Sequence, residues 1–429
     1  MILVDSALRR RSDEGRPVRV GMVGAGAMGQ AIALQIRQHT PGMELVVISN
    51  RTPETAERAL VQAGADEVRR VVSAQELETA RARGVPAVTD DPALVCGSDV
   101  VDVVLEVTGA VEAGARVVLD AIAHGKHVVT MNAELQGTVG PALKDYADRA
   151  GVVLTDSDGD QPGVMMNLHR FVQQTGARPV LVGNMKGLQD SYRTPTTQAE
   201  FARRGGLSPQ MATSFADGTK MTFENALVAN ATGMRVRPGG MLGPDCEGED
   251  VADVQRHWPV EELLDGPGLV DYVVGARPAP GVFVLATHDH PLQRHWMRMY
   301  KQGDGPVYTY FVPYHLCHME VPITIARAAL FQDAAVSPHA GHVMDVVTTA
   351  KRDLCAGEVL DGIGFHMSYG TGANVDDARA GDLLPMGISE GCTLTRDVVK
   401  DSVLTYADVD VPTGRLIDRL RTEQEAGTP

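Results

Sequence analysis

The chain has few of the residues on which several classes of protein depend. Only five of its 429 residues are cysteines, and no two of them form a C-x-x-C pair. Scattered cysteines of this kind are typical of a reducing compartment, and they argue against both a disulfide framework and a cysteine-based zinc cluster. We therefore expect a cytoplasmic protein.

Basic residues and long apolar runs are also scarce. The chain has 39 Lys and Arg against 55 Asp and Glu, a formal net charge of −16. Nucleic acids and anionic membranes need basic surfaces, so neither is an expected partner. No run approaches the roughly 18 apolar residues of a membrane span, and residues 1–16 lack the apolar core of a signal peptide. An anionic substrate would have to meet cations placed locally.

Glycine, by contrast, is concentrated near the start of the chain. An apolar run of strand type, residues 18–23, leads into Gly24, Gly26 and Gly29, and a segment with helical spacing follows. In a dinucleotide-binding fingerprint the first glycine allows a tight turn, the second leaves room for the pyrophosphate, and the third lets the helix pack closely. We expect the phosphates to meet the N–H groups at the helix start, including those of Ala27 and Met28.

The end of the next strand indicates which dinucleotide binds. An NAD-binding chain usually has Asp or Glu about twenty residues after the last glycine, but here the strand ends in Ser49, Asn50, Arg51 and Thr52. Arg51 is suited to a 2′-phosphate, with Asn50 and Thr52 supplying hydrogen bonds. The sequence therefore favours NADP, with NAD as the alternative if Arg51 is only a solvated loop residue.

Alternating apolar runs and helical segments continue to residue 155 and predict a doubly wound Rossmann domain over residues 17–155. The expected strands are 18–23, 43–49, 99–106, 127–130 and 151–155, and the expected helices are 27–38, 53–64, 110–125 and 139–150, with one more at 73–83.

Ligands of open α/β sheets bind beyond the carboxyl ends of the strands. Thr108, Gly109 and Asn132 follow two such ends and are predicted to bind the cofactor, and Glu134 is predicted to face the substrate. The competing interpretation is that these residues only cap the segments that follow.

Three carboxylates open the second part of the chain. Asp156, Asp158 and Asp160 fall within five residues, directly ahead of an apolar helix expected over residues 164–174. Such a density of negative charge is costly unless a cation or a helix N-terminus compensates it. Asp158 and Asp160 are therefore predicted catalytic residues and candidate ligands of Mg²⁺ or Mn²⁺, with helix capping as the alternative.

Two lysines then stand out. Lys186 follows an apolar strand expected at 179–183, and its ammonium group is placed to hold a carbonyl, carboxylate or phosphate oxygen. Lys220 and Glu224 lie one turn apart on a helix expected over residues 221–231, most of whose other positions are small or apolar. A buried Lys–Glu pair is expensive unless it serves a site, so we predict that all three residues are catalytic. The alternatives are a surface lysine for Lys186 and an ordinary ion pair for Lys220 and Glu224.

Further polar residues near this region complete the predicted site. Asp190 is a predicted catalytic residue, and Arg193 is a predicted substrate contact. His315 and His318 flank Cys317, but their offsets do not place three ligands on one helical face, which argues against zinc. Both are predicted substrate contacts, with a structural role as the alternative.

The last third of the chain has its own pattern. Residues 238–267, rich in Gly, Pro and acids, are expected to form a long excursion, and strands at 269–275, 281–287 and 307–312 to form a mainly antiparallel sheet. A helix from 320 to 333 should pack back on the first domain. Short strands near 350–360, 383–388 and 394–400 predict a small β-rich domain, with residues 370–381 as a flexible or ligand-ordered loop.

Five motifs together resemble the homoserine-dehydrogenase-like oxidoreductases that end in a SAF domain, a group that includes deoxyxylulose phosphate reductoisomerase-like and apionate oxidoisomerase-like enzymes. The motifs are Gly24-x-Gly26-x-x-Gly29, Asp158-Gly-Asp160-Gln-Pro-Gly, Gly183-Asn-Met-Lys186-Gly, Ala216-Asp-Gly-Thr-Lys220 and Ala350-Lys-Arg-Asp-Leu-x-Ala-Gly-Glu.

The resemblance implies an α/β architecture of three parts: the Rossmann domain, an inserted α+β catalytic and oligomerisation domain over residues 156–335, and a SAF-like domain over residues 343–429. Its implied chemistry is a carbon-skeleton rearrangement coupled to hydride transfer on a small sugar phosphate or sugar acid, in a homodimer or homotetramer.

Two alternatives stay open at this point. Homoserine dehydrogenases carry a Lys where Asn132, Ala133 and Glu134 stand here. A simple dehydrogenase of a hydroxy acid or amino-alcohol would therefore need another lysine, such as Lys220, in that role. The other alternative is a dinucleotide-sensing protein without turnover.

Overall fold

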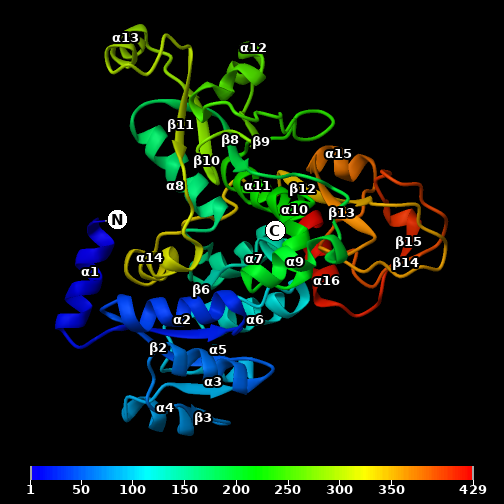
Figure 1. The fold of residues 1–429 in the computed structure, drawn as a ribbon. Coiled ribbons are helices and arrows are strands. Elements are labelled where there is room, and N and C mark those ends of the chain that lie inside the picture. Colours follow the sequence, from blue (N-terminus) through cyan, green and yellow to red (C-terminus); the bar gives the residue numbers. More distant parts are fainter. Residues whose placement is uncertain (1, 428–429) are drawn as a thin grey trace. The chain divides into compact units, whose positions relative to one another are not determined.

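The computed structural model describes residues 2–427, and its internal contacts divide the chain into two compact units (Figure 1). Unit 1 contains Met1–Asp160, Leu316–Ser337 and Arg415–Pro429; unit 2 contains Gln161–His315 and Pro338–Gly414. The chain therefore passes between the units four times, and each unit is assembled from segments far apart in the sequence.

Unit 1 is built on a parallel sheet of seven strands in the order β3-β4-β2-β1-β5-β6-β7. The strands are β1 (Val18–Val23), β2 (Met43–Ser49), β3 (Arg69–Arg70), β4 (Ala87–Thr89), β5 (Val103–Glu106), β6 (His127–Thr130) and β7 (Leu154–Asp156). β1 lies between β2 and β5, so the strand order reverses beside it, and this switch point is where ligands of doubly wound sheets bind.

Helices complete unit 1, and they are α1 (Ile2–Asp13), α2 (Ala27–His39), α3 (Pro53–Gln62), α4 (Ala74–Ala82), α5 (Pro92–Gly97), α6 (Val111–Ala123), α7 (Ala133–Ala150), α14 (Cys317–Phe331) and α16 (Leu416–Ala426). The core joins β1 and β2 to α2, α3 and α14, and it includes Ile32, Ile48, Leu60 and Ile325, none of them exposed. The expected doubly wound fold is thus confirmed, and α14 packs within it as predicted.

Several elements of unit 1 differ from the sequence-based expectation. The segment 65–98 adds the short strands β3 and β4 to the edge of the sheet, and these strands were not predicted. Residues 2–13 form α1, which was not predicted either. α7 begins at Ala133 rather than at residue 139. Gly137, Gly140 and Pro141 are poor helix formers, but burial of this face outweighs their low propensity.

The C-terminal helix α16 belongs to unit 1 and packs on α6 and α7. Glu112 on α6 accepts hydrogen bonds from the N–H groups of Leu416 and Ile417 at 3.1 and 3.0 Å, which caps α16. The side chain of Gln424 accepts one from the N–H of Ala142 at 3.2 Å. These bonds satisfy backbone donors in both helices.

Unit 2 contains a four-stranded sheet in the order β11-β10-β8-β9. β10 (Gly281–Thr287) pairs antiparallel with β8 (Arg178–Lys186) and with β11 (Val307–Val312), whereas β9 (Leu269–Val274) pairs parallel with β8. The expected mainly antiparallel sheet is confirmed. α8 (Gln161–Gln174) and α11 (Thr219–Thr232) pack against these strands.

The excursion 238–267 is anchored by one buried carboxylate. Asp271 on β9 accepts hydrogen bonds from the N–H groups of Leu242 and Gly243 and from the indole N–H of Trp258, at 2.9 to 3.1 Å. Burial raises the pKa of Asp271, although these donors act in the opposite direction. Trp258 in turn packs with Phe283 of the sheet, so the excursion is part of the core of unit 2.

The remaining elements of unit 2 are α9 (Pro195–Gly205), α10 (Pro209–Ala216), η1 (Val251–His257), α12 (Val260–Leu264), α13 (Pro291–Met299), β12 (Met344–Ala350), β13 (Ser368–Asn374), α15 (Val375–Ala380), β14 (Thr393–Leu394), η2 (Tyr406–Asp408) and β15 (Val409–Asp410).

The tail 338–414 contains few residues in regular strands. β12 pairs antiparallel with β13, and the rest of the tail consists largely of turns and isolated bridges. The expected loop at 370–381 is a wrong prediction, because residues 370–374 complete β13 and residues 375–380 form α15. The glycines that indicated a loop are instead needed for packing, since a Cβ on Gly370 would lie 2.6 Å from Val346. The identification of this tail as a SAF domain stays a prediction.

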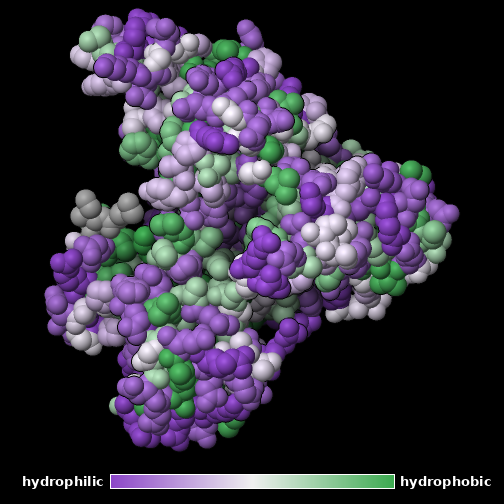
Figure 2. Space-filling view, viewed as in Figure 1, coloured by the Kyte–Doolittle hydropathy of each residue, from purple (hydrophilic) through white to green (hydrophobic). Residues whose placement is uncertain are grey.

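The surface in Figure 2 is mostly hydrophilic, with hydrophobic residues in separate patches. Among the residues that the structure describes, no helix combines the length and apolar character that crossing a bilayer would require.

Candidate functional site

The glycine fingerprint lies at the end of β1 and the start of α2 in unit 1. Gly24 has φ +111°, and a Cβ there would lie 2.7 Å from the carbonyl oxygen of Val107. A Cβ on Gly29 would lie 2.6 Å from the carbonyl oxygen of Gly24, whereas a Cβ on Gly26 would meet no atom within 4 Å. The first and third glycines are thus required by close packing, and the second faces open space.

The start of α2 offers hydrogen-bond donors to an anion. Gly26 is the N-cap residue and supplies no side-chain acceptor, so the N–H groups of Ala27, Met28 and Gly29 in the first turn have no partner within the helix. Together with the positive end of the helix dipole, they favour a bound phosphate. These features fit a dinucleotide pyrophosphate.

The end of β2 supplies the next predicted cofactor residues. The side chain of Asn50 accepts a hydrogen bond from the N–H of Ala25 at 3.2 Å and donates one to the carbonyl of Thr52 at 2.9 Å. Asn50 therefore holds the loop after β2 next to the glycine fingerprint. This structural role is additional to the cofactor binding that the sequence predicts. Arg51 and Thr52 are exposed, so both side chains are accessible to a ligand.

A buried carboxylate organises the ends of β5 and β6. Glu106, the last residue of β5, accepts hydrogen bonds from the N–H and hydroxyl of Thr108 and, at 3.1 Å, from the side-chain amide of Asn132. Burial raises the pKa of Glu106, while these donors act against the rise. Thr108 and Asn132, both predicted to bind cofactor, are thus held in place by a residue that the sequence analysis did not select.

Asn132, Gly109 and Glu134 differ in how accessible they are. Asn132 is fully buried and caps α7 by accepting from the N–H of Leu135 at 3.1 Å, so its side chain is already occupied. Gly109 is exposed and has φ +67°, and Glu134 lies half-buried in the first turn of α7. The capping interpretation therefore describes Asn132, and Glu134 stays a predicted substrate contact.

In unit 2 the two lysines belong to one polar network, which we call the lysine cluster and which consists of Gln161, Asn184, Lys186, Lys220, Glu224 and Asn225. The side-chain amide of Asn184 donates to Gln161 at 2.7 Å and to Glu224 at 3.0 Å. Its oxygen accepts from Asn225 at 2.7 Å. Asn184 thus has defined partners on both sides and holds Glu224 in a fixed position.

Each lysine approaches this network from a different element. Lys186, the last residue of β8, donates to the side-chain oxygen of Gln161 at 3.4 Å. Lys220, in the first turn of α11, lies 3.6 Å from the carboxylate of Glu224, and its side chain is 17% exposed against 3% for Glu224. One ammonium group, that of Lys220, therefore lies beside a buried carboxylate, and the other is linked to that carboxylate through Gln161 and Asn184. Such a set can bind an anionic or developing oxyanion group and exchange a proton.

Asp190 and Arg193 pair with each other in the loop after β8. The guanidinium of Arg193 lies 2.9 Å from the carboxylate of Asp190, and both side chains are about a third exposed. The carboxylate also accepts the N–H of Tyr192 at 3.1 Å. The pair shapes this loop, and the predicted catalytic role of Asp190 and substrate role of Arg193 stay predictions.

Asp158 has a cationic partner that sequence reasoning missed. Arg327 on α14 donates to the two carboxylate oxygens of Asp158 at 2.8 and 3.1 Å, and the hydroxyl of Thr324 donates to the same group at 2.9 Å. Asp158 is 1% exposed. The compensating cation is therefore an arginine of unit 1, and a metal ion at Asp158 would have to displace it. The donor set around Asp158 does not fit a divalent cation.

The other predicted residues of this region are assigned to different units. Asp160, which is 4% exposed, is the last residue of the first segment of unit 1. His315 ends a segment of unit 2, whereas His318 lies in the first turn of α14 in unit 1, where burial lowers its pKa. The metal role of Asp160 and the substrate roles of the two histidines stay predictions.

A group of candidate metal ligands lies within unit 2, where atoms of Cys246, Glu249 and His257 come within 4.8 Å of one another. Glu249, however, is already bound by His257 at 2.8 Å and by Arg256 at 2.9 Å. Burial raises the pKa of the Cys246 thiol to about 11, so the thiol is protonated near neutral pH when no ion is bound.

Two of the site residues that the sequence analysis did not select share a recognisable sequence pattern. Glu106 and Asn184 are polar residues at or near the ends of otherwise apolar strands, which is the signal that had selected Lys186. Arg327 carries no such signal, because its partner lies 169 residues away and only the fold brings the two together.

Two family models match the chain. Residues 24–154 match the model described as "Homoserine dehydrogenase, NAD binding domain". Residues 159–321 match the model described as "Oxidoreductase DRL, catalytic domain". The first segment contains the glycine fingerprint, and the second contains the whole lysine cluster.

Known proteins resemble the chain over about a third of its length. The homoserine dehydrogenase of Bacillus subtilis (strain 168) is 32% identical over 136 residues, which is 32% of this chain and 28% of that enzyme. That of Mycobacterium bovis is 30% identical over 139 residues, again 28% of its length. The match thus spans little more than a quarter of these relatives.

Among solved structures, a homoserine dehydrogenase from Thiobacillus denitrificans aligns over 90% of this chain and 98% of its own, with 14% identity and a TM-score of 0.44. At this sequence identity and TM-score, the structural similarity says nothing about the activity of this chain. The domain matches carry more weight: residues 24–154 are similar to a homoserine dehydrogenase NAD-binding domain, and residues 159–321 are similar to an oxidoreductase DRL catalytic domain.

Proposed function

We propose that this protein is an NAD(P)-dependent oxidoreductase in which unit 1 binds the dinucleotide and the lysine cluster of unit 2 acts on the substrate. The observation that carries the proposal is the start of α2, where Gly26 leaves both open space and uncapped N–H groups. The domain matches described above support it. When bound, the nicotinamide supplies hydride transfer.

We further propose NADP as the preferred cofactor. The loop after β2 contains no carboxylate to bind ribose hydroxyls, and it presents Arg51 at the surface beside Asn50 and Thr52. A guanidinium there pairs with a 2′-phosphate and gains little from a free hydroxyl.

For the reaction we propose an oxidoisomerase or reductoisomerase acting on a small sugar phosphate or sugar acid. Lys186 and Lys220 would hold two oxygens of the substrate and stabilise the charge that develops as a carbon–carbon bond breaks and reforms. Glu224, fixed by Asn184, would exchange the proton. Because the donors around Asp158 do not fit a divalent cation, the two ammonium groups take the electrostatic role in this proposal.

A simple dehydrogenase of a hydroxy acid or amino-alcohol is the second candidate, favoured by the homoserine dehydrogenase matches in the first domain. Here Lys220 would polarise the reacting oxygen. We also propose that the protein acts in the cytoplasm as a homodimer or homotetramer, for which light scattering gives the subunit count.

The test is to incubate the protein with NADP⁺ or NADPH and a panel of sugar acids, sugar phosphates, hydroxy acids and amino-alcohols, and to identify the products by NMR. A product with a rearranged carbon skeleton supports the oxidoisomerase, and one with an unchanged skeleton supports the dehydrogenase. Tight cofactor binding without turnover across the panel contradicts both and indicates a dinucleotide sensor.

Once a substrate is found, Lys186→Ala and Lys220→Ala should each lower kcat by about 10² or more, since each removes a charge that stabilises the transition state. Cofactor affinity should stay nearly unchanged. Arg203→Ala is the matched control, because Arg203 on α9 is exposed and its loss removes the same charge from unit 2. Wild-type turnover in both lysine variants would remove the cluster from the active site.

A further inference from the structure

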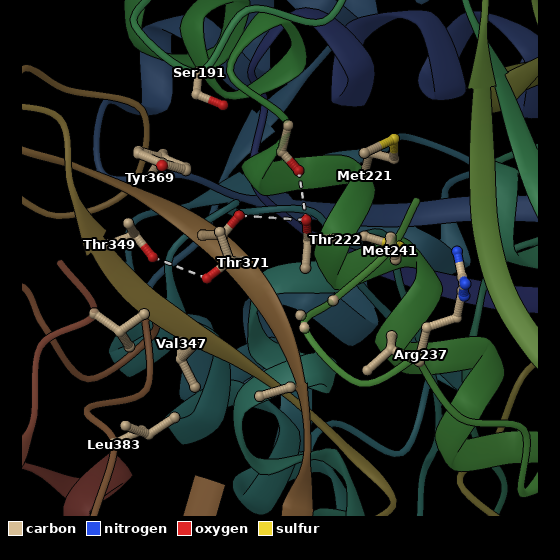
Figure 3. Close-up of a pocket in the computed structure, with 18 of the residues that line it drawn as sticks. Ser191, Met221, Thr222, Arg237, Met241, Val347, Thr349, Tyr369, Thr371 and Leu383 are labelled. Carbon is tan, nitrogen blue, oxygen red and sulfur yellow. Dashed lines mark hydrogen bonds between the residues drawn. The ribbon is translucent and has the colours of Figure 1, made fainter. Parts of the chain in front are cut away.

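Unit 2 contains a cavity of ≈ 480 Å³ (Figure 3). Lys220 and Glu224 are absent from its lining, because helical spacing places them on a different face of α11. Gly218, Met221 and Thr222 line the cavity, and their spacing places them on one side of the helix. The opposite wall is formed by β12, β13 and the tail near Val403. The volume lies within the range of about 300–1,000 Å³ that is typical of small-molecule sites.

Hydroxyls are the most frequent kind of polar group in the lining of this cavity. They belong to Ser191, Thr222, Tyr272, Thr349, Tyr369 and Thr371. The hydroxyls of Thr349 on β12 and Thr371 on β13 lie 2.8 Å apart, and Thr222 donates to the carbonyl of Gly218 at 2.8 Å. Each hydroxyl can both donate and accept, so the set matches a ligand that also carries hydroxyls.

The charges at this cavity argue against an anionic ligand. Asp217, Asp377 and Asp401 line it, against one guanidinium, that of Arg237. Arg237 is paired with Glu262 at 2.5 Å, and Asp217 is paired with Lys351 at 2.7 Å. Among these lining groups, the one cation is therefore already in an ion pair, so the cavity does not attract a phosphate or a carboxylate.

The remaining walls are apolar or formed by glycine. Met221, Met241, Val347 and Leu383 provide surface for the C–H faces of a ligand. Gly239, at φ +88°, has open space at its Cβ position, so the backbone of the 237–241 loop is accessible there.

We propose that this cavity is a second small-molecule site, separate from the lysine cluster, which binds an uncharged, hydroxyl-rich molecule such as a polyol or a neutral sugar. Paired threonine hydroxyls contact the hydroxyls of the ligand, and the methionine and leucine side chains contact its carbon skeleton. The proposal does not depend on the proposed reaction, because it concerns binding alone.

The experiment measures binding to the full chain by calorimetry and ligand-observed NMR. The neutral probes are xylitol, myo-inositol and D-glucose, the anionic ones gluconate and glucose 6-phosphate, and the cationic one glucosamine. We expect at least one neutral probe to bind with one-to-one stoichiometry. The double variant Thr349→Val/Thr371→Val should weaken it about tenfold, since two hydroxyl partners are lost without a change of shape.

Thr348→Val is the matched control. Thr348 lies on β12 between Val347 and Thr349, so its side chain points to the other face of the strand, and its buried hydroxyl has no hydrogen-bond partner among the described residues. This variant and Lys220→Ala should bind the neutral probe as the wild type does. If the double variant fails to fold, Ser191→Tyr provides the loss-of-binding test, because it places a ring in the cavity from a partly exposed loop.

Three results would overturn the proposal. The first is that no neutral probe binds, and the second is that only the charged probes bind. The third is that a neutral probe still binds to Thr349→Val/Thr371→Val and to Ser191→Tyr but no longer binds to Lys220→Ala. Catalytic turnover plays no part in these readouts, so a failed assay of the proposed reaction and a failed cavity site can be told apart.

Discussion

Gly26 and Gly29 are three residues apart, yet their surroundings differ in kind. A Cβ on Gly26 would enter open space, and its backbone angles (φ −65°, ψ −170°) suit any residue. A Cβ on Gly29 would lie 2.6 Å from a backbone oxygen. One glycine is therefore required by the ligand that we propose, and the other by the fold.

This difference predicts that two substitutions separate binding from stability. Gly26→Val should weaken NADP binding at least about tenfold while leaving the unfolding midpoint nearly unchanged, because its side chain would occupy the phosphate position. Gly29→Ala should instead lower the free energy of unfolding by about 1–3 kcal/mol, since backbone must shift. Fluorescence titration and urea unfolding measure the two effects. Equal losses of affinity and stability in Gly26→Val would contradict this assignment.

Arg51 permits a second test at this scale. If its guanidinium binds the 2′-phosphate, Arg51→Ala should weaken NADP binding by about tenfold or more and leave NAD binding unchanged, because NAD lacks that group. Titrations with both cofactors measure the difference. If Arg51 only stacks on adenine, both affinities fall together, and the preference for NADP must have another origin.

Residues were predictable from the sequence where the signal is local. The fingerprint glycines follow an apolar strand and Lys186 ends one, and that pattern can be recognised without a structure. Arg327 and Lys351 were not predictable as ion-pair partners, because each pairs with a carboxylate more than 130 residues away. Nothing in a linear sequence indicates which charges the fold will bring together.

At the scale of elements, one buried ion pair joins α10 to the end of β12. Asp217 is the C-cap residue of α10, and Lys351 directly follows β12. The ammonium of Lys351 donates to Asp217 at 2.7 Å and to the carbonyls of Arg193 and Phe365 at 2.8 and 2.9 Å. Neither side chain is more than 2% exposed.

Breaking this pair on one side should be costly. Lys351→Met leaves the Asp217 carboxylate buried without its cation, which typically costs about 3–5 kcal/mol. Adding Asp217→Asn should restore part of the loss, because no unpaired charge then remains. Denaturant unfolding of the two variants and of Asp217→Asn alone completes the cycle. If the double variant is as unstable as the sum of the single ones, the two residues do not act as a pair.

Elements were predictable where hydrophobic periodicity is strong. β1, β2, β6, β10 and β11 have the bounds that the sequence predicts. The tail departs most from expectation, because its glycines serve close packing between β12, β13 and α11 rather than loop flexibility. α7 departs for a related reason: its glycines and proline weaken the local helical signal, and tertiary burial compensates for it.

At the scale of the whole molecule, unit 1 includes a helix, α16, that follows all of unit 2 in the chain and packs on α6 and α7. Ile417 and Leu420 of α16 are buried, and α16 also bonds to α6 and α7. This packing could not be predicted from the sequence, since a short amphipathic helix does not reveal which distant surface it covers.

Leu420→Ala should therefore destabilise unit 1 specifically, by about 2–5 kcal/mol, as expected for a fully buried leucine. Amide hydrogen exchange should become faster in α6 and α7, whereas the sheet of unit 2 should be unaffected. Arg419→Ala is the control on the same helix, because the Arg419 side chain is 61% exposed. Equally faster exchange in both units would show that they unfold as one.

The position of α16 in the chain also bears on biosynthesis. The ribosome synthesises the elements from β1 through α7 first and the long second unit next. It synthesises α16, the helix that covers α6 and α7, only after both. During that interval the nascent polypeptide exposes the apolar surface that Ile417 and Leu420 later bury, and this surface is where chaperones or premature aggregation would act.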